Sequence, residues 1–181
     1  MACSVTSTSD LNGVWKTTDV SGQPPDPIDY LAVDGARWGM ITNGDKYFYS
    51  QSTTIAGDGS GEFYLSNNGG TMYLEKYTGK ELVMTHKGVT RTYKLDDNAT
   101  SATIYNKTST SYTMYVYEKD SNGDYLYFVD AGTILAGGWR GPLCVYTDTL
   151  YVAVYDYNGN FVTTYNWTDL EKGVKYSLSF N

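Results

Sequence analysis

The chain has 181 residues, which is enough for one large all-β domain or two small ones. Apolar residues make up 41% and charged residues 18%, a composition that can form a core and that excludes an intrinsically disordered chain. The net charge of −7 argues against nucleic acid or an anionic membrane surface as a partner, because both attract clustered Lys and Arg. Nineteen tyrosines and nineteen glycines, with only four prolines, are typical of strands and turns.

The chain contains few of the side chains that bind metals through nitrogen or sulfur. His86 is the single histidine, and Cys3 and Cys144 are the two cysteines. A structural zinc site needs four such ligands, so we expect none, and we expect no other cofactor. Cys3 lies in a polar N-terminal tail and Cys144 in an apolar run far along the chain, so we also expect no disulfide between them.

The first ten residues resemble the start of a mature bacterial lipoprotein. Cys3 is followed by a Ser- and Thr-rich segment, as in a lipid-anchored protein whose cysteine carries the lipid and whose tether is flexible. No apolar signal segment precedes the cysteine, so this interpretation requires a removed signal peptide. The alternative is an ordinary polar N-terminus with an incidental cysteine. The lipoprotein interpretation predicts a cell-envelope or secreted location, with lipidation at Cys3 and residues 1–10 as the tether.

Turn dipeptides divide the first half of the chain into short segments. Asn-Gly and Asp-Gly pairs tolerate the positive φ of hairpin turns, and they recur at short intervals. Between the turns lie segments whose lengths are typical of antiparallel strands. The expected strands are 12–20, 28–34, 36–42, 45–53, 61–66, 70–77, 80–86 and 89–95.

The apolar pattern breaks around residues 96–100, and a second set of strands follows. Their expected ranges are 102–107, 111–118, 124–130, 142–146, 149–157, 160–166 and 174–180. We therefore expect two domains, a small barrel at 11–97 and an antiparallel β-sandwich at 98–181.

Two strands of the second half show alternation with period two. Tyr112, Met114 and Val116 alternate with Thr113, Tyr115 and Tyr117, and Leu150, Val152 and Val154 alternate with Tyr151, Ala153 and Tyr155. Successive side chains of a strand point to opposite faces of its sheet. We expect the aliphatic side chains in the core and the tyrosine rows on the other face.

The segment Leu11-x-Gly13-x-Trp15 resembles the opening G-x-W strand of lipocalin-like proteins. The Pro-rich loop at Pro24, Pro25 and Pro27 and the later segments 60–64 and 82–84 fit the same pattern. Residues 11–95 thus resemble the short lipocalin-like domains of secreted Bacteroidetes lipoproteins. The resemblance implies a β-barrel in which the tryptophan plugs one end. About 85 residues would form a narrow barrel with little room for a ligand inside.

The second half has a weaker resemblance. Residues 158–180, with apolar residues alternating from Val174 to Phe180, resemble the last hairpin of Ig-like or transthyretin-like sandwiches of bacterial surface proteins.

Two acidic turns imitate the beginning of a calcium-binding loop. In residues 120–124 and 156–160, however, the glycine falls at the fourth position and not the sixth. Ala131 and Trp167 stand where a bidentate glutamate is needed. We interpret both segments as hairpin turns.

The sequence contains no recognisable catalytic signature. His86 lacks a nearby nucleophile motif, and Glu62, Glu81 or Asp45 would meet it only through the fold. A histidine beside Lys87 at a strand end is typical of a solvated surface residue. We therefore expect a protein that is not an enzyme.

The tyrosines are the most informative feature for binding. Exposed phenol rings can stack on sugars or anchor a protein partner at low entropic cost. The simpler interpretation, which we favour for the tyrosines as a group, is that they cover a sheet face and pair across strands. We expect Trp15 and Trp38 in the core. Trp139 and Trp167 lie in turn-like surroundings, and Trp139 stands beside Arg140 among glycines, which is typical of a ligand-contacting loop.

The sequence therefore predicts a non-catalytic cell-envelope protein that binds a glycan or a small apolar ligand. The alternative is a structural or protein-interaction module of a bacterial surface assembly. The candidate ligand-binding residues are Trp139, Arg140, Tyr115, Tyr117, Tyr151 and Tyr155.

Overall fold

The computed structural model describes residues 7–22, 30–41, 49–57, 61–66, 68–119 and 122–181, and it consists of β-strands. The expected all-β class is confirmed. A 3₁₀ turn, η1 (Thr8–Leu11), is the one helical element among these residues, so nothing helical there could span a bilayer.

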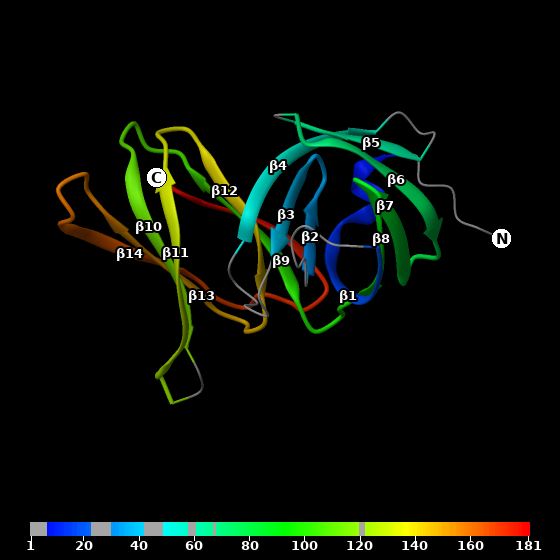
Figure 1. Cartoon of the computed structure of the whole chain (residues 1–181). Coiled ribbons are helices and arrows are strands. Elements are labelled where there is room, and N and C mark those ends of the chain that lie inside the picture. The colour runs from blue at the N-terminus through cyan, green and yellow to red at the C-terminus, as the bar shows by residue number, and fades with distance from the viewer. Residues whose placement is uncertain (1–6, 23–29, 42–48, 58–60, 67, 120–121) are drawn as a thin grey trace.

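Eight strands of the first half form an antiparallel barrel (Figure 1). The barrel closes because β1 pairs with β2 on one side and with β8 on the other. The strands are β1 (Gly13–Ser21), β2 (Tyr30–Asp34), β3 (Arg37–Ile41), β4 (Tyr49–Gly57), β5 (Glu62–Leu65), β6 (Gly70–Tyr77), β7 (Glu81–His86) and β8 (Val89–Leu95). The expected ranges agree closely, except that β4 continues to Gly57; part of its expected range, 45–48, lies outside the described residues.

The hairpin between β7 and β8 shows how the turn residues set the register. His86 pairs with Val89, which leaves Lys87 and Gly88 as a two-residue loop. Both loop residues have positive φ, 50° and 76°. This combination matches the twist of the flanking strands, and glycine adopts it without strain.

Large apolar side chains fill the barrel. Trp15 and Trp38 are 1% and 0% exposed, which confirms that both belong to the core. The indole N–H of Trp15 donates to the carbonyl oxygen of Leu11 at 2.8 Å, so the 3₁₀ turn is attached to the barrel interior. The other buried members of this core are Leu11, Leu31, Val33, Met40, Phe63, Leu65, Met72, Leu82, Met84 and Tyr93. An eight-stranded barrel leaves little more than side-chain space inside, and here that space is occupied by the core.

Seven further strands form two stacked sheets with their own core. The four-stranded sheet has the order β11-β10-β13-β14 and the three-stranded sheet the order β12-β9-β15. The strands are β9 (Thr100–Asn106), β10 (Tyr112–Lys119), β11 (Tyr125–Ile134), β12 (Trp139–Val145), β13 (Leu150–Tyr155), β14 (Phe161–Trp167) and β15 (Lys175–Phe180). Buried aliphatic residues such as Ile104, Val116 and Val152 join the two sheets.

The expectation that the chain ends in a hairpin is wrong. β14 pairs with β13, whereas β15 joins the other sheet and runs parallel to β9. Leu170 is buried in the sandwich core between these strands and anchors the segment that crosses from one sheet to the other. After the crossing, Leu178 and Phe180 complete the same core. Burial of these apolar residues thus accounts for the parallel pair.

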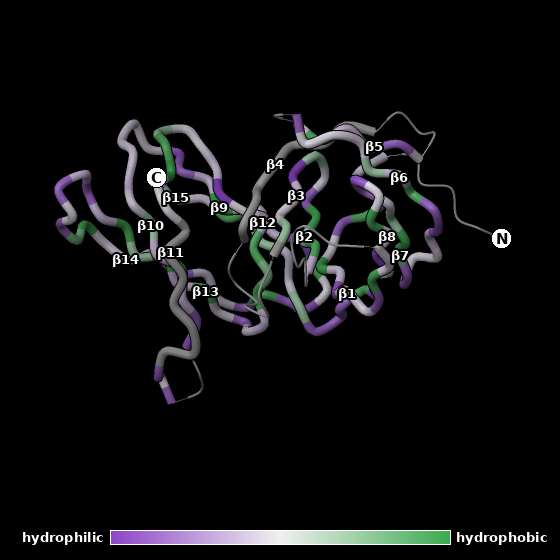
Figure 2. The backbone as a smooth tube through the Cα atoms, viewed as in Figure 1, coloured by the Kyte–Doolittle hydropathy of each residue, from purple (hydrophilic) through white to green (hydrophobic). Residues whose placement is uncertain are grey.

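The molecule has three layers, with the three-stranded sheet between the barrel and the four-stranded sheet (Figure 1). Figure 2 shows apolar segments of β2 and β12 where the barrel and this middle layer meet. The barrel strands all lie within residues 13–95 and the others within 100–180. That residues 11–97 and 98–181 are two separate domains stays a prediction.

An ion pair with a buried carboxylate links the barrel to the middle layer. Asp34 at the end of β2 is 3% exposed. Its carboxylate accepts a hydrogen bond from the Thr103 hydroxyl at 2.7 Å and lies 2.9 Å from the Lys175 ammonium. Ser101 donates its hydroxyl to the Val33 carbonyl oxygen at 3.2 Å. These contacts satisfy polar groups that the interface removes from water.

Close packing completes this interface. A Cβ atom on Gly39 would lie 2.3 Å from the carbonyl oxygen of Pro142, so only glycine allows β3 and β12 to approach so closely. Cys144 is fully buried in a small cluster with Tyr30 of the barrel. Tyr146 packs against that cluster, and burial, together with neighbouring Cys144 and Asp96, raises the pKa of its phenol.

Candidate functional site

Four of the six expected ligand-binding residues lie together on the outer face of the four-stranded sheet. The alternation along β10 and β13 is confirmed, because Met114, Val116, Leu150, Val152 and Val154 are at most 2% exposed. The tyrosines between them point the other way, toward the side of this sheet remote from the barrel. We call Tyr115, Tyr117, Tyr151 and Tyr155 the tyrosine face; Tyr117 is buried within it at 7% exposure, and the other three are half-buried.

The rings of the tyrosine face contact one another in two pairs. Tyr117 and Tyr151 stand opposite each other in the β10–β13 ladder, and their rings stack with centroids 5.1 Å apart and planes 8° apart. Tyr115 and Tyr155 meet edge to face at 5.2 Å. Tyr155 also contacts the edge of Phe161, which is 59% exposed, at 5.6 Å. The pairing fixes ring orientations before any ligand arrives.

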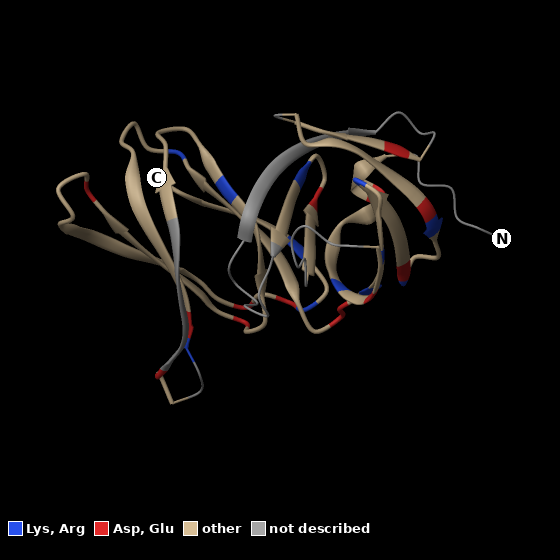
Figure 3. Cartoon of the chain, viewed as in Figure 1, with Lys and Arg blue, Asp and Glu red and all other residues tan. Residues whose placement is uncertain are grey.

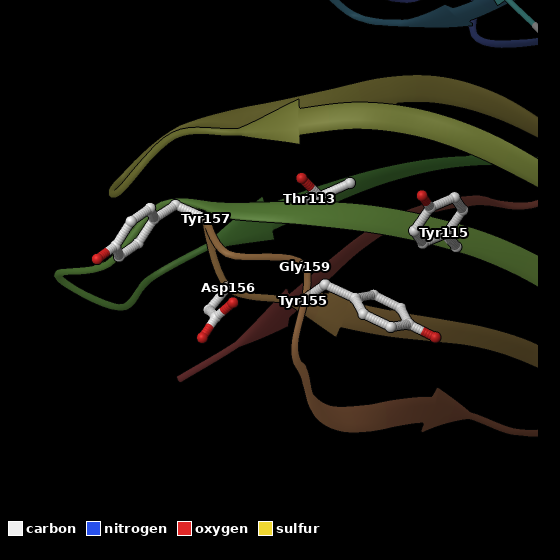
Figure 4. Close-up of a pocket in the computed structure, with 6 residues that line it drawn as sticks. All are labelled: Thr113, Tyr115, Tyr155, Asp156, Tyr157 and Gly159. Atoms are coloured by element: carbon white, nitrogen blue, oxygen red, sulfur yellow. The ribbon is translucent and has the colours of Figure 1, made fainter.

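An open pocket of about 440 Å³ lies at one end of this face (Figure 4). We call it the Tyr155 pocket. In the close-up, the rings of Tyr115 and Tyr155 lie at one end and Tyr157 at the other, with the Asp156 carboxylate between them. Tyr157 is 92% exposed. Aromatic faces beside carboxylate and hydroxyl oxygens are what a sugar requires, since a sugar has both a C–H face and hydroxyl groups. The lining residues are Thr113, Tyr115, Tyr155, Asp156, Tyr157 and Gly159.

The β13–β14 turn that borders this pocket is held by Asp156. Its carboxylate accepts hydrogen bonds from the backbone N–H groups of Asn158 and Asn160 at 2.9 and 2.8 Å. The Asn160 side-chain amide donates a third, at 3.0 Å. The pKa of Asp156 is lowered from its usual value, chiefly by the two hydrogen bonds from Asn160. The carboxylate is therefore ionised near neutral pH.

These hydrogen bonds support the interpretation of residues 156–160 as a hairpin turn. The carboxylate that would be the first calcium ligand is engaged by the turn itself. In the part of the chain that the structure describes, no group of three His, Cys, Asp or Glu residues is placed to hold a metal. The first acidic turn begins at 120–121, outside the described residues.

A second pocket, of about 390 Å³, lies at the opposite end of the face. We call it the Lys172 pocket. The Lys119 ammonium lies 4.8 Å from the ring centroid of Tyr151, so this pocket continues directly from the stacked pair. Asp148 is exposed and accepts a hydrogen bond from the Thr149 hydroxyl at 3.1 Å. The pocket is lined by Lys119, Tyr146, Thr147, Asp148, Thr149, Tyr151 and Lys172.

Glu118 shapes the wall of the Lys172 pocket from inside the sandwich. This residue is 0% exposed, and its Oε1 atom accepts the backbone N–H groups of Tyr146 and Thr147 at 3.0 and 3.2 Å. The carboxylate thereby fixes the loop between β12 and β13 that carries part of the lining.

Trp139 and Arg140 lie on the three-stranded sheet and not with the tyrosine face. Trp139 is the first residue of β12, so the expectation of turn-like surroundings is wrong. It is half-buried, and the Arg37 guanidinium of the barrel lies 4.9 Å from its ring centroid. Arg140 donates its Nε hydrogen to the Thr133 carbonyl oxygen at 2.6 Å. The glycines before Trp139 form the turn, and the tryptophan itself packs at the interface between layers.

Two other residues considered from the sequence lie elsewhere. His86 is half-buried at the end of β7, and its Nε2 donates to the Gly69 carbonyl oxygen at 2.7 Å. It is therefore less solvated than expected. Cys3 lies outside the described residues.

Several side chains near the tyrosine face were not selected from the sequence. The period-two pattern that places Tyr115 and Tyr117 on this face also predicts that Thr113 and Lys119 lie there, since all four share one face of β10. The position of Phe161 beside the tyrosine face could be predicted only once β14 is paired with β13, which sets it opposite Tyr155. No local sequence feature predicts that Lys172 lies at this pocket, because the residue belongs to the segment that crosses from β14 to β15.

Comparisons with protein-family models, curated proteins and solved structures find no match to this chain. The assignment of function therefore depends on the geometry of the site.

Proposed function

We propose that this protein is a non-catalytic binding protein that holds a glycan on its tyrosine face. The observation that carries the proposal is the pair of ordered ring contacts, Tyr117 on Tyr151 and Tyr115 on Tyr155, beside an open pocket. Rings that are already ordered lose little entropy when a ligand binds. The Thr113 hydroxyl borders the same pocket and can donate or accept a hydrogen bond, and Asp156 Oδ2, which accepts one hydrogen bond within the turn, can accept another from a sugar hydroxyl.

The location of the site supports the same function. The tyrosine face belongs to the layer farthest from the barrel, so a ligand there does not need to displace any part of the fold (Figure 1). Figure 3 shows β13 and β14 without charged residues along their length. Because these two strands carry aromatic residues and no charge, a ligand would bind along them by stacking contacts and not by ionic ones.

Replacing Tyr155 with alanine is expected to weaken binding of any oligosaccharide that the protein recognises by about tenfold. The reason is that this change removes one stacking surface and also the support of the Tyr115 and Phe161 rings, worth about 1–1.5 kcal/mol. A glycan array would identify ligands, and titration calorimetry would give the dissociation constants of the wild type and the variant.

A tyrosine of the barrel serves as the matched control. Tyr73 on β6 is 47% exposed, so Tyr73→Ala removes a similar ring from a surface outside the site. It is expected to leave binding unchanged. The proposal fails if the array detects no glycan, or if Tyr155→Ala binds as tightly as the wild type.

A second function, protein interaction, is favoured by one observation on β14. This strand forms an edge of the four-stranded sheet and, among the described strands, pairs only with β13. It carries no charged residue and no proline, and Phe161 and Val162 are 59% and 46% exposed. Charges and prolines are the usual protection of an edge against strand addition. Two copies of this strand could pair antiparallel without like-charge repulsion, so the partner would be a second copy of the chain.

Val162→Lys tests this second function. A charge on the edge strand is expected to abolish self-association, because pairing would place two ammonium groups close together. Sedimentation over a range of concentrations measures the effect. A wild-type protein that stays monomeric at high concentration would reject the interaction, without bearing on glycan binding.

Two properties stay predictions from the sequence alone. They are the relationship of residues 11–95 to lipocalin-like domains of Bacteroidetes lipoproteins, and the cell-envelope location with a lipid on Cys3.

A further inference from the structure

We propose that the tyrosine face selects glycans that carry an anionic group, and that the Lys172 pocket is the subsite for this group. The inference rests on the proposed function and adds the chemical class of the ligand. The ligand would lie with its uncharged part on the rings and in the Tyr155 pocket. A carboxylate or sulfate ester at its other end would lie between Lys119 and Lys172.

The two pockets border opposite ends of β13 on the tyrosine face. Tyr155 lines the first pocket and Tyr151 the second, and both point outward from β13. Four residues of strand separate their Cα atoms by roughly 13 Å, a distance that an oligosaccharide spans. Ala153 lies between them on the same face, opposite Tyr115 in the ladder, and is 6% exposed.

The charges differ between the two ends. Among its described lining residues, the Tyr155 pocket has one carboxylate, on Asp156, and no basic residue. The described lining of the Lys172 pocket has two lysines, Lys119 and Lys172, and one carboxylate, on Asp148; the buried Glu118 carboxylate lies behind this lining and is engaged by the backbone of Tyr146 and Thr147. An anionic sugar placed there would meet both lysines, and the Asp148 oxygens would be left to accept its hydroxyl groups.

The subsite is also held in place by the core. Buried Glu118 fixes the loop carrying Tyr146 and Thr147, and the Lys119 ammonium lies over the Tyr151 ring. Tyr117 stacks on the Tyr151 ring as well, so an anionic group at this end would contact the Lys119 ammonium above the ring and not the ring face itself. Because the chain has a net charge of −7, it has no general attraction for anions, and any preference must arise from these two lysines.

The test compares ligands that differ only in charge. The probes are an oligouronate of defined length, its carboxyl-reduced form, and a sulfated derivative of the reduced form. The wild type is expected to bind the oligouronate, the sulfated form or both about tenfold more tightly than the uncharged form, as measured by titration calorimetry. Each of the two lysines is expected to contribute about two- to fivefold. The two charged probes distinguish a carboxylate from a sulfate as the preferred group.

Lysine variants test the position of the subsite. Lys172→Gln and Lys119→Gln are each expected to lower affinity for the charged probes by about two- to fivefold and to leave the uncharged probe unaffected. Lys80→Gln is the matched control, because this lysine lies on the barrel with its side chain 81% exposed. It changes the net charge equally and is expected to preserve the preference. Tyr155→Ala is expected to weaken all three probes to the same extent.

The outcomes separate the two proposals. If all three probes bind with equal affinity, the anionic selection is wrong and glycan binding stands. A preference that survives Lys172→Gln and Lys119→Gln would also reject the subsite. If none of the probes binds and the glycan array is empty, the proposed function itself fails.

Discussion

Replacing Trp15 with alanine is expected to lower the free energy of unfolding by about 3–5 kcal/mol, the usual cost of removing a large buried aromatic side chain. Trp15 is 1% exposed, its ring contacts Tyr77 edge to face at 6.2 Å, and its indole N–H donates to the Leu11 carbonyl oxygen. The change leaves a cavity in the barrel and detaches the 3₁₀ turn from it. Urea unfolding followed by circular dichroism would measure the loss.

Trp15→Phe distinguishes the two contributions. The phenyl ring keeps much of the buried volume but cannot donate to Leu11, so a smaller loss of about 1–2 kcal/mol is expected. Tyr73→Ala, on the outer face of the barrel, should change stability by less than about 0.5 kcal/mol. A loss below about 1 kcal/mol for Trp15→Ala would contradict the role of this residue in the barrel core.

Replacing Lys175 with methionine is expected to lower the free energy of unfolding by about 2–3 kcal/mol. Asp34 would stay buried with the Thr103 hydroxyl as its one remaining partner of the two described contacts. Removing one member of a fully buried ion pair costs about 3–5 kcal/mol. The expected loss is smaller here because the Lys175 side chain is 39% exposed, so water can reach its place. Denaturant unfolding monitored by intrinsic fluorescence would report the change, since Trp139 lies at the same interface.

A second ion pair provides the control. Lys76 lies 2.6 Å from Glu81 on the barrel surface, with side chains 56% and 30% exposed. Lys76→Met is expected to cost less than about 1 kcal/mol, because both groups regain water. Adding Asp34→Asn to Lys175→Met should restore part of the stability, since the amide is neutral and its oxygen still accepts from Thr103. Equal losses of unfolding free energy for Lys175→Met and Lys76→Met would show that the interface ion pair contributes no more to stability than the surface ion pair.

The two sets of strands show which local features can be identified from a sequence. Turn dipeptides and period-two alternation depend on neighbouring residues only, and they located the strands to within a few residues along most of the chain. Alternation also placed Tyr115, Tyr117, Tyr151 and Tyr155 on one face. The sequence misplaces Trp139 in a loop, because the glycines before it are typical of a longer turn. In the structure the Arg37 guanidinium of the barrel lies over its ring.

The sequence by itself determined the all-β class, the strand positions, the two buried tryptophans and the tyrosine rows, because each follows from short-range patterning. Tertiary structure decided which strands pair where no short turn joins them. It placed β15 parallel to β9, brought Lys172 beside Lys119 at one end of the tyrosine face, and buried Asp34 against Lys175. Such contacts join residues far apart in the chain, and they form because burying apolar surface between layers selects one arrangement of strands whose local patterns are compatible with several.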